Sequence, residues 1–473
     1  MRVLFVIQHV DYEPQGLLHL SSVLQAAGHE VDLVVAQHQD PVEVARTWQP
    51  RIVGYSVMTG SQRYYLELNR RLRAAAPVFS VFGGPHPTFF PELIEEEGVD
   101  GICIGEGEGA LVDLANTLGQ EQFDPHIPNW HLKWEGQIVR TPVRPTIADL
   151  DALPVPDRDL LYDRDPASRR SKIKHFITSR GCPYNCSYCF NHALFELYGT
   201  KANRFRQRSV DNVLAEIKHV RDKYPLQHVV FVDDTFVVSH AWLEEFARKY
   251  PAEIGLPFFC NTRANLVTRE QVQLLKAAGC HCVSMGVEAG NDRIRNEVLK
   301  RNMSREHILG AARLFHECGL NFTTTNIIGL PTSAIENDLE TLALNAECRP
   351  AYAHAFIFQP YPRTQLGEMT RRQDLMVGTF DDMGALAWER SVLKFPPRQL
   401  RQIENLQRFF AFGVEWPWLL PLFRRLMDWP PNVVFWFVNK VWKGYVIKKR
   451  VHPVKLSFRE YLDIAWQFMK INS

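Results

Sequence analysis

The feature that most constrains this chain is a regular alternation of short apolar runs and helix-like stretches over the first 120 residues. This alternation predicts an α/β fold in which a parallel sheet carries helices on both faces. Ligands of such sheets bind beyond the carboxyl ends of the strands. The expected strands are Val3–Ile7, Val31–Ala36, Ile52–Ser56, Val78–Phe82 and Asp100–Ile104. The expected helices are Gly16–Ala27, Pro41–Trp48, Ser61–Ala75, Thr88–Glu97 and Glu108–Leu118.

A second strand–helix series begins near Lys174. Its six strands with helical crossovers predict a partial (β/α)6 TIM-like barrel, in which chemistry takes place at the C-terminal ends of the strands. The expected strands are His175–Ser179, His228–Val232, Phe258–Thr262, Cys282–Val287, Phe322–Ile328 and Ala355–Gln359.

Two further segments lack this alternation. Residues 126–172 are rich in proline and charge, which predicts a linker. The strand signal fades after about residue 372, so the rest is predicted to be helical. We therefore expect a Rossmann-like domain of residues 1–125, a linker of 126–172, a barrel of 173–372 and a helical region of 373–473.

The charge balance and the cysteines limit the class of protein. The 473 residues include 54 Lys and Arg against 53 Asp and Glu, a net charge of +1. This near-neutral balance argues against a nucleic-acid partner. The apolar run at the N-terminus is too short for a signal peptide, and nine cysteines are too few for a disulfide scaffold. We therefore expect a cytoplasmic protein with reduced thiols.

Three of the cysteines stand close together, at Cys182, Cys186 and Cys189, just after an expected strand. Three thiolates on one loop can hold three corners of an iron–sulfur cube and leave one iron open for a small molecule. A zinc site with His192 as the fourth ligand is the alternative. The other cysteines are scattered, and Cys280 and Cys282 are expected to pack in the core.

The cysteine spacing resembles the signature of the radical S-adenosylmethionine (SAM) enzymes, Cys-x-x-x-Cys-x-x-Cys with an aromatic residue, here Tyr188, before the last cysteine. The resemblance implies that Cys182, Cys186 and Cys189 are the metal ligands of a 4Fe–4S cluster whose open iron binds SAM. One electron, from a reductant such as flavodoxin or ferredoxin, then yields a 5′-deoxyadenosyl radical. A cofactor is needed because no side chain can perform this step.

The resemblance also implies SAM-binding residues at successive strand ends. Asp233 or Asp234 would hold the amino group, although the Gly-Gly-Glu pattern of many relatives is absent here. Arg263 would pair with the SAM carboxylate. Glu288 suits the ribose hydroxyls, and the backbone at Ile327 and Gly329 would cradle adenine.

The first domain resembles the cobalamin-binding domain that precedes the barrel in one subclass of these enzymes. The motif of that domain begins with Asp11, Glu13 and Gly16 after the first strand. It continues with Ser56 after the third strand, with Gly83, Gly84 and His86 after the fourth, and with Gly105 and Glu106 after the fifth.

One departure from this motif matters, because Glu13 stands where the motif has the lower axial histidine of cobalt. The resemblance therefore implies cobalamin bound without a histidine from this motif. A sheet that keeps the fold and binds nothing is the alternative.

The stretch Phe409–Trp442 holds five tryptophans near several Arg and Lys residues. Its longest uncharged run, Trp429–Asn439, is too short to span a bilayer. Two interpretations remain open, an aromatic lid over the barrel mouth and a peripheral membrane contact. Both favour an apolar, lipid-like small-molecule substrate.

These features together predict a cobalamin-dependent radical SAM enzyme. The expected reaction is methyl transfer to an unactivated carbon by way of a 5′-deoxyadenosyl radical and methylcobalamin. A radical cyclisation or rearrangement without methyl transfer is the alternative within the class. A cobalamin or iron–sulfur sensor protein is the alternative outside it.

Overall fold

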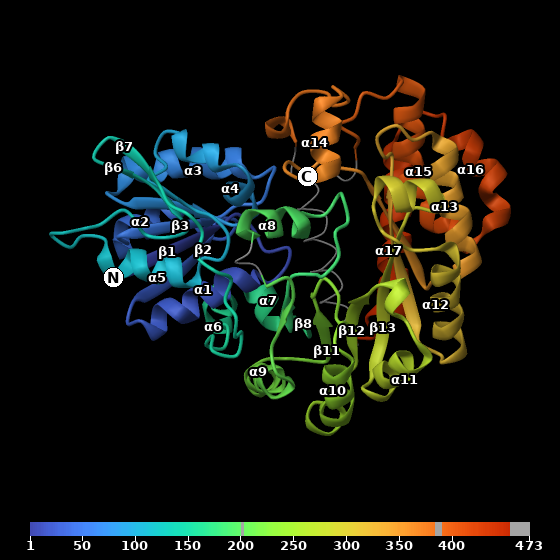
Figure 1. Cartoon of the computed structure of the whole chain (residues 1–473), viewed down its shortest axis with the longest axis horizontal. Coiled ribbons are helices and arrows are strands. Elements are labelled where there is room, and N and C mark those ends of the chain that lie inside the picture. Colours follow the sequence, from blue (N-terminus) through green and yellow to red (C-terminus); the bar gives the residue numbers. More distant parts are fainter. Residues whose placement is uncertain (200–202, 384–389, 455–473) are drawn as a thin grey trace.

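The computed structural model describes residues 1–199, 203–383 and 390–454. The apolar runs of the N-terminal region form a seven-stranded sheet, drawn in blue to teal in Figure 1. Its strand order is β2-β1-β3-β4-β5-β6-β7, with the first five strands parallel and the last two antiparallel. The strands are β1 (Arg2–Ile7), β2 (Glu30–Val35), β3 (Ile52–Ser56), β4 (Phe79–Gly83), β5 (Gly101–Cys103), β6 (Trp130–Trp134) and β7 (Gln137–Arg140).

Helices cover both faces of this sheet, as expected. Helices α1 and α5 pack against each other on one face, and α2 and α3 pack together on the other. The helices are α1 (Gln15–Ala26), α2 (Pro41–Trp48), α3 (Gln62–Ala75), α4 (Pro85–Phe89), η1 (Pro91–Glu95) and α5 (Glu108–Thr117). The single helix expected over Thr88–Glu97 is wrong, because Pro91 keeps Phe90 out of helical geometry, at φ −124° and ψ 71°.

The expected linker of residues 126–172 is partly wrong, because strands β6 and β7 extend the N-terminal sheet. They form a hairpin whose turn residues, Glu135 and Gly136, both have positive φ, at 48° and 76°. The indole of Trp130 is buried and donates to the carbonyl of Ala110, which fixes the hairpin against α5. Two short helices, α6 (Arg158–Tyr162) and α7 (Pro166–Arg170), complete the connection.

The second sheet is the expected half-barrel of six parallel strands, in the order β15-β14-β13-β12-β11-β8. A short antiparallel pair of β9 and β10, with α8 between them in the chain, forms a separate two-stranded sheet. The strands are β8 (Ile173–Phe176), β9 (Ser179–Arg180), β10 (Arg206–Gln207), β11 (His228–Phe231), β12 (Phe258–Thr262), β13 (Cys280–Glu288), β14 (Asn321–Ile328) and β15 (Tyr352–Ile357). The connections contain α8 (Phe190–Tyr198), α9 (Val210–Lys223), α10 (His240–Glu253), η3 (Ala264–Leu266), α11 (Arg269–Ala277), η4 (Ile294–Val298), α12 (Arg305–Glu317) and α13 (Ile335–Cys348).

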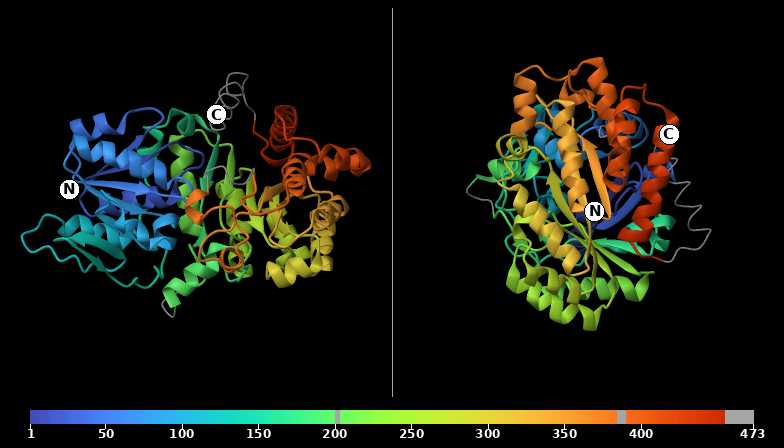
Figure 2. Two further views of the ribbon diagram at one scale, coloured as in Figure 1. Left: turned by 90° about the horizontal axis from the view of Figure 1, so that it is seen from above. Right: turned by 90° about the vertical axis from the view of Figure 1, so that its right-hand side faces the viewer.

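The C-terminal region is helical over its described residues, as expected; residues 384–389 and 455–473 lie outside them. Its elements are α14 (Gln365–Arg372), η5 (Phe380–Asp382), α15 (Pro397–Glu415), η7 (Pro417–Leu419), α16 (Leu420–Leu426), α17 (Val433–Val446) and η8 (Ile447–Val451). Helix α15 packs on α13 and β15, at the end of the molecule away from the N-terminal sheet (Figures 1 and 2).

This arrangement corrects the expectation of an aromatic lid over the barrel mouth. The segment η8 contacts β13 and β14, and Arg450 donates to the carbonyl of Ala351, just before β15. His452 contacts His228, the first residue of β11. The end of the described chain therefore crosses the N-terminal ends of the strands, opposite to the ends where chemistry is expected. The apolar residues of α15 pack against β15 and α13. No helix of the described residues is long and apolar enough to cross a membrane.

Candidate active site

The three clustered cysteines occupy the loop between β9 and α8, at the C-terminal end of the first barrel strand. All three are free thiols, as are the other cysteines. Each sulfur lies near a different polar group. The hydroxyl of Thr235 lies 3.9 Å from Cys182, the Arg263 guanidinium donates to Cys186 at 3.3 Å, and the Asn191 amide donates to Cys189 at 3.6 Å.

The donor set fits an iron–sulfur cluster. Burial raises the pKa of Cys189 to about 12, so this thiol keeps its proton until a metal ion replaces it. Cysteine thiolates hold such a cluster, and hydrogen bonds to the sulfurs help to set its reduction potential. The zinc alternative fails on His192. One ring nitrogen of His192 lies 3.0 Å from the carbonyl oxygen of Cys186, and the other accepts from the backbone of Gln365.

A second polar group lies beside the loop, around Arg301, which the sequence analysis did not single out. Its guanidinium donates to the hydroxyl of Tyr188 at 2.9 Å and lies 3.6 Å from a carboxylate oxygen of Glu288. The hydroxyl of Thr325 donates to the same carboxylate at 3.1 Å. Burial raises the pKa of Glu288, and Arg301 partly offsets this. No local pattern reveals Arg301, because it lies 113 residues from Tyr188 in the chain.

The two acids after β11 have different surroundings. Asp233 is fully buried and accepts hydrogen bonds from the backbone of Thr178 and the hydroxyls of Thr178 and Ser179. Its carboxylate therefore anchors the strand that leads to the cysteines. Asp234 is exposed and accepts only from Asn191 among the described contacts, at 3.0 Å. Of the two, Asp234 is the acid with room for an ammonium group.

The guanidinium of Arg263 is occupied by protein groups on all sides. It donates to Asn265, to Cys186 and to the carbonyl of Arg301, and it stacks over the ring of Tyr184 at 3.9 Å. Each terminal nitrogen of the guanidinium carries a second N–H, so the pairing with a SAM carboxylate stays a prediction. In this structure Arg263 contacts Cys186 of the cysteine loop.

The residues expected near adenine lie at the end of β14. Ile327 packs in the same apolar cluster as Tyr188. Gly329 has a φ of +64° and its backbone donates to Asp338, whose pKa burial raises to about 7. A side chain at this glycine would also meet Ile403, 3.0 Å from the ideal Cβ position. The turn therefore needs glycine for both its backbone angle and its packing.

A cavity of about 320 Å³ opens at the carboxyl ends of the N-terminal parallel strands, between the sheet and helices α1 and α5. Six of the nine residues that the motif assigned to cobalamin line it: Gly16, Ser56, Gly83, Gly84, Gly105 and Glu106. Apolar residues missed by the motif, among them Phe5, Gly54 and Trp130, form its inner wall. The cavity therefore offers room for part of a large cofactor at the place where parallel α/β sheets bind ligands.

The remaining three residues of the motif do not line this cavity. Asp11 lies on the surface, where it pairs with His9 at 2.9 Å. His86 of α4 is buried, stacks on Phe90 and lines a second cavity. Glu13 is also buried, and its carboxylate faces the barrel.

Glu13 belongs to a buried network of charges between the two domains. Its carboxylate accepts from Arg158 at 2.8 Å and from the hydroxyl of Tyr162 at 2.5 Å. Arg158 also donates to Glu216 of α9 at 2.7 Å, and Glu216 accepts from Arg208. Although burial raises the pKa of Glu13, the charge of Arg158 brings it down to about 2. The acid that replaces the histidine of the motif thus joins the domains.

Arg180 connects the cavity to the cysteine loop. It stands two residues before Cys182, lines the cavity, and pairs with Glu106 at 3.2 Å and Glu108 at 2.5 Å. Glu106 pairs with Arg206 of β10 as well, at 2.8 Å. The strand that presents the cysteines is therefore fixed to the wall of the cavity.

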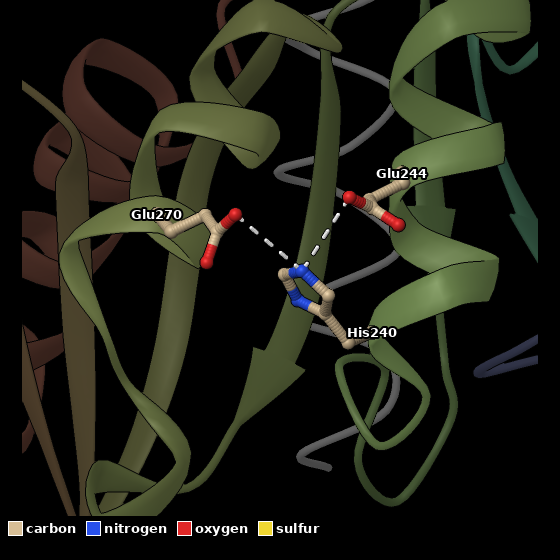
Figure 3. A group of neighbouring side chains, drawn as sticks. All are labelled: His240, Glu244 and Glu270. Atoms are coloured by element: carbon tan, nitrogen blue, oxygen red, sulfur yellow. Dashed lines mark ion pairs between the residues drawn. The ribbon is translucent and has the colours of Figure 1, made fainter.

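The described residues hold one other group of side chains with metal-ligand chemistry, His240, Glu244 and Glu270 (Figure 3). His240 lies 3.6 Å from each glutamate, and all three side chains are largely exposed on α10 and α11. This group is an ordinary surface ion-pair cluster.

Two family models match the chain. The Radical SAM superfamily matches residues 176–344, and the B12 binding domain matches residues 1–115. An uncharacterized methyltransferase of Pyrococcus horikoshii is 27% identical over 373 residues, which cover 77% of this chain and 80% of the relative. An anaerobic magnesium-protoporphyrin IX monomethyl ester cyclase of Rubrivivax gelatinosus is 27% identical over 400 residues, covering 77% and 69%.

A solved structure shares the fold. The radical SAM methyltransferase TsrM of Kitasatospora setae, with a tryptophan substrate and a SAM analogue, aligns with a TM-score of 0.66 at 21% identity. The alignment covers 80% of this chain and 77% of that one. The fold of most of this chain is therefore shared with that structure.

Proposed function

The chain belongs to the radical SAM superfamily and carries a B12 binding domain, and on this premise we propose that it transfers a methyl group to an unactivated carbon of a small-molecule substrate. Its cofactors are a 4Fe–4S cluster, SAM and cobalamin. When bound, they supply a radical that removes hydrogen from carbon and a methyl group that replaces it.

One observation carries this proposal, the connection through Arg180. This residue lines the cavity proposed for cobalamin and lies two residues from the first cysteine of the cluster loop. A methyl donor and a radical source must both reach one substrate carbon, which requires them to be held close together and in fixed orientation. A sensor protein would have no need of this arrangement.

The residues divide the work as follows. Cys182, Cys186 and Cys189 hold the cluster, and Asp234 is placed to accept from the amino group of SAM. Glu288, fixed by Thr325 and Arg301, is placed for the ribose hydroxyls. A one-electron reductant of the flavodoxin or ferredoxin type would be the partner, and a reducing cytoplasm would suit the free thiols.

The test is to incubate the reconstituted protein with SAM, reductant and cobalamin and to analyse the products by mass spectrometry. Methyl transfer predicts both 5′-deoxyadenosine and S-adenosylhomocysteine, since one SAM supplies the radical and a second supplies the methyl group. Only 5′-deoxyadenosine would indicate cyclisation or rearrangement, which the relationship to the cyclase of Rubrivivax gelatinosus makes the second candidate. If neither product forms, both candidate reactions are overturned.

Variants of the cysteine loop test the cluster itself. Replacement of Cys182, Cys186 and Cys189 by Ala should remove about four irons per chain and abolish SAM cleavage. Cys318→Ala is the matched control, because that thiol lies half-buried outside the loop. Retention of iron by the triple variant would contradict the assignment.

A further inference from the structure

Helix α17 is apolar on two sides, and only one of them is covered. The inner stripe, Phe435, Asn439, Trp442 and Val446, follows the spacing i, i+4, i+7, i+11 and packs on α15. A second stripe, one residue earlier, is Val434, Val438, Val441 and Tyr445. Residues of a helix with this spacing share one face. All four side chains of the second stripe are exposed.

Further exposed apolar side chains lie on α17 and on the elements just before it in the chain. Val433, which is 73% exposed, and Phe437, which is 59% exposed, flank the second stripe on α17. Trp418, Leu422 and Trp429 add exposed apolar side chains from η7, α16 and the turn before α17. We call this set of nine residues the outer apolar face: Trp418, Leu422, Trp429, Val433, Val434, Phe437, Val438, Val441 and Tyr445. Single exposed apolar residues need no explanation, but several on one face of a helix, as on α17, mark a binding surface.

The charges around this face have one sign. Residues 416–452 contain seven Lys and Arg residues and one acid, Asp428, which is paired with Arg398. Arg424, Arg425 and Lys449 are exposed. Lys449 lies over the ring of Tyr445 at 5.5 Å, so its long side chain borders the apolar face. Tryptophans and basic residues around a flat apolar surface are typical of helices that lie in a lipid interface.

We propose that the outer apolar face docks the protein on an anionic lipid bilayer. The apolar side chains enter the boundary between head groups and acyl chains, and the basic residues contact the anionic head groups. Helices α16 and α17 lie in the half of the molecule that holds the barrel, away from the N-terminal sheet (Figures 1 and 2). This inference is independent of the proposed reaction.

Vesicle flotation of the full chain tests the proposal. The protein should float with vesicles of phosphatidylcholine containing one third phosphatidylglycerol, and it should remain at the bottom with pure phosphatidylcholine. Binding should weaken as salt rises, because salt screens the attraction between exposed charges. No flotation with either vesicle, or equal flotation with both, would overturn the proposal.

Two variants and their matched controls test the residues. Phe437→Ser with Val441→Ser should reduce vesicle partitioning by about tenfold or more. Val377→Ser, at a site 61% exposed outside the face, should not. Partitioning equal to that of the parent chain in the double variant would overturn the proposal.

The charge variant is Arg424→Gln with Arg425→Gln, which should reduce binding to anionic vesicles by about tenfold. The control, Arg70→Gln with Arg71→Gln, removes two exposed charges from α3 and should leave binding unchanged. An equal loss in the control would contradict the role given to the face.

Two results would assign the face to another occupant and overturn the proposal. The parent chain could fail to float and form a dimer that the double variant Phe437→Ser and Val441→Ser dissociates. This result would assign the outer apolar face to a second copy of the chain. Faster proteolysis of residues 455–473 in that variant, again without flotation, would assign it to the chain's own C-terminal segment.

Discussion

Replacement of Glu13 by Gln should destabilise the junction between the two domains. The change removes one negative charge from a site where Glu13 is almost fully buried against Arg158, while the shape of the side chain is kept. The cationic guanidinium then keeps Glu216 as a partner and loses its second one. A buried charge left without full compensation is costly because the surrounding protein cannot replace water.

The magnitude follows from the pKa of the carboxyl group. Folding lowers the pKa of Glu13 from 4.5 to about 2, because Arg158 and neighbouring donors outweigh the cost of burial. At neutral pH the ionised group therefore contributes about 3 kcal/mol, present above pH 4.5 and lost as the pH falls toward 2. Breaking a buried ion pair costs a similar 3–5 kcal/mol or so in other proteins.

The assay is thermal unfolding at pH 7, with bound cobalamin measured in parallel. A loss of about 3 kcal/mol should lower the first unfolding midpoint by roughly 5–10 °C. Glu43→Gln is the matched control, since the same change at an exposed pair with Arg46 should cost only about 0.5 kcal/mol. Equal midpoints for the two variants would refute the argument that the network stabilises the junction.

Two further predictions concern the cavity of the N-terminal domain and the histidine pair at the N-terminal ends of the barrel strands. Gly54→Val should lower the affinity for cobalamin about tenfold or more and leave the iron content unchanged, because an added Cβ lies 3.0 Å from the ring of Phe5. The control is Gly310→Ala on α12, and equal cobalamin titrations for the two variants would contradict the prediction. Burial lowers the pKa of His228 to about 3 and that of His452 to about 4, so the unfolded chain takes up more protons below pH 6.5. Stability should therefore fall by up to about 1.4 kcal/mol per pH unit for each histidine as the pH drops below 6.5, and a thermal midpoint that stays constant from pH 7.5 to 5.5 would contradict this.

The sequence was sufficient for features that depend on neighbouring residues. The spacing of Cys182, Cys186 and Cys189 lies within one loop, so the donor set needs no knowledge of the fold. The parallel strands of both sheets were predicted to within about three residues at each end, because each is a short apolar run between helices. Four glycines of the cavity, Gly16, Gly83, Gly84 and Gly105, were found through the resemblance to the cobalamin-binding motif, while Gly54 was missed.

The hairpin of β6 and β7 shows how local signals can mislead. The prolines of residues 126–172 predicted a linker, yet all six of them fall outside β6 and β7. What binds the hairpin to the sheet is the buried Trp130, whose partner Ala110 lies 20 residues earlier. Residue propensities take account of the prolines within the segment, but they do not include a contact that α5 supplies from outside it.

Only the tertiary structure decided which side chains meet. Glu13 reads as a substituted cobalt ligand in the sequence, but its partner Arg158 lies 145 residues away and directs it into the domain junction. Arg263 faces Cys186 instead of open space, and Arg301 enters the site from 113 residues beyond Tyr188. The physical reason is that spacing along the chain fixes hydrogen bonds and periodicity within one element, while the partner of a buried charge is fixed by how separate elements pack.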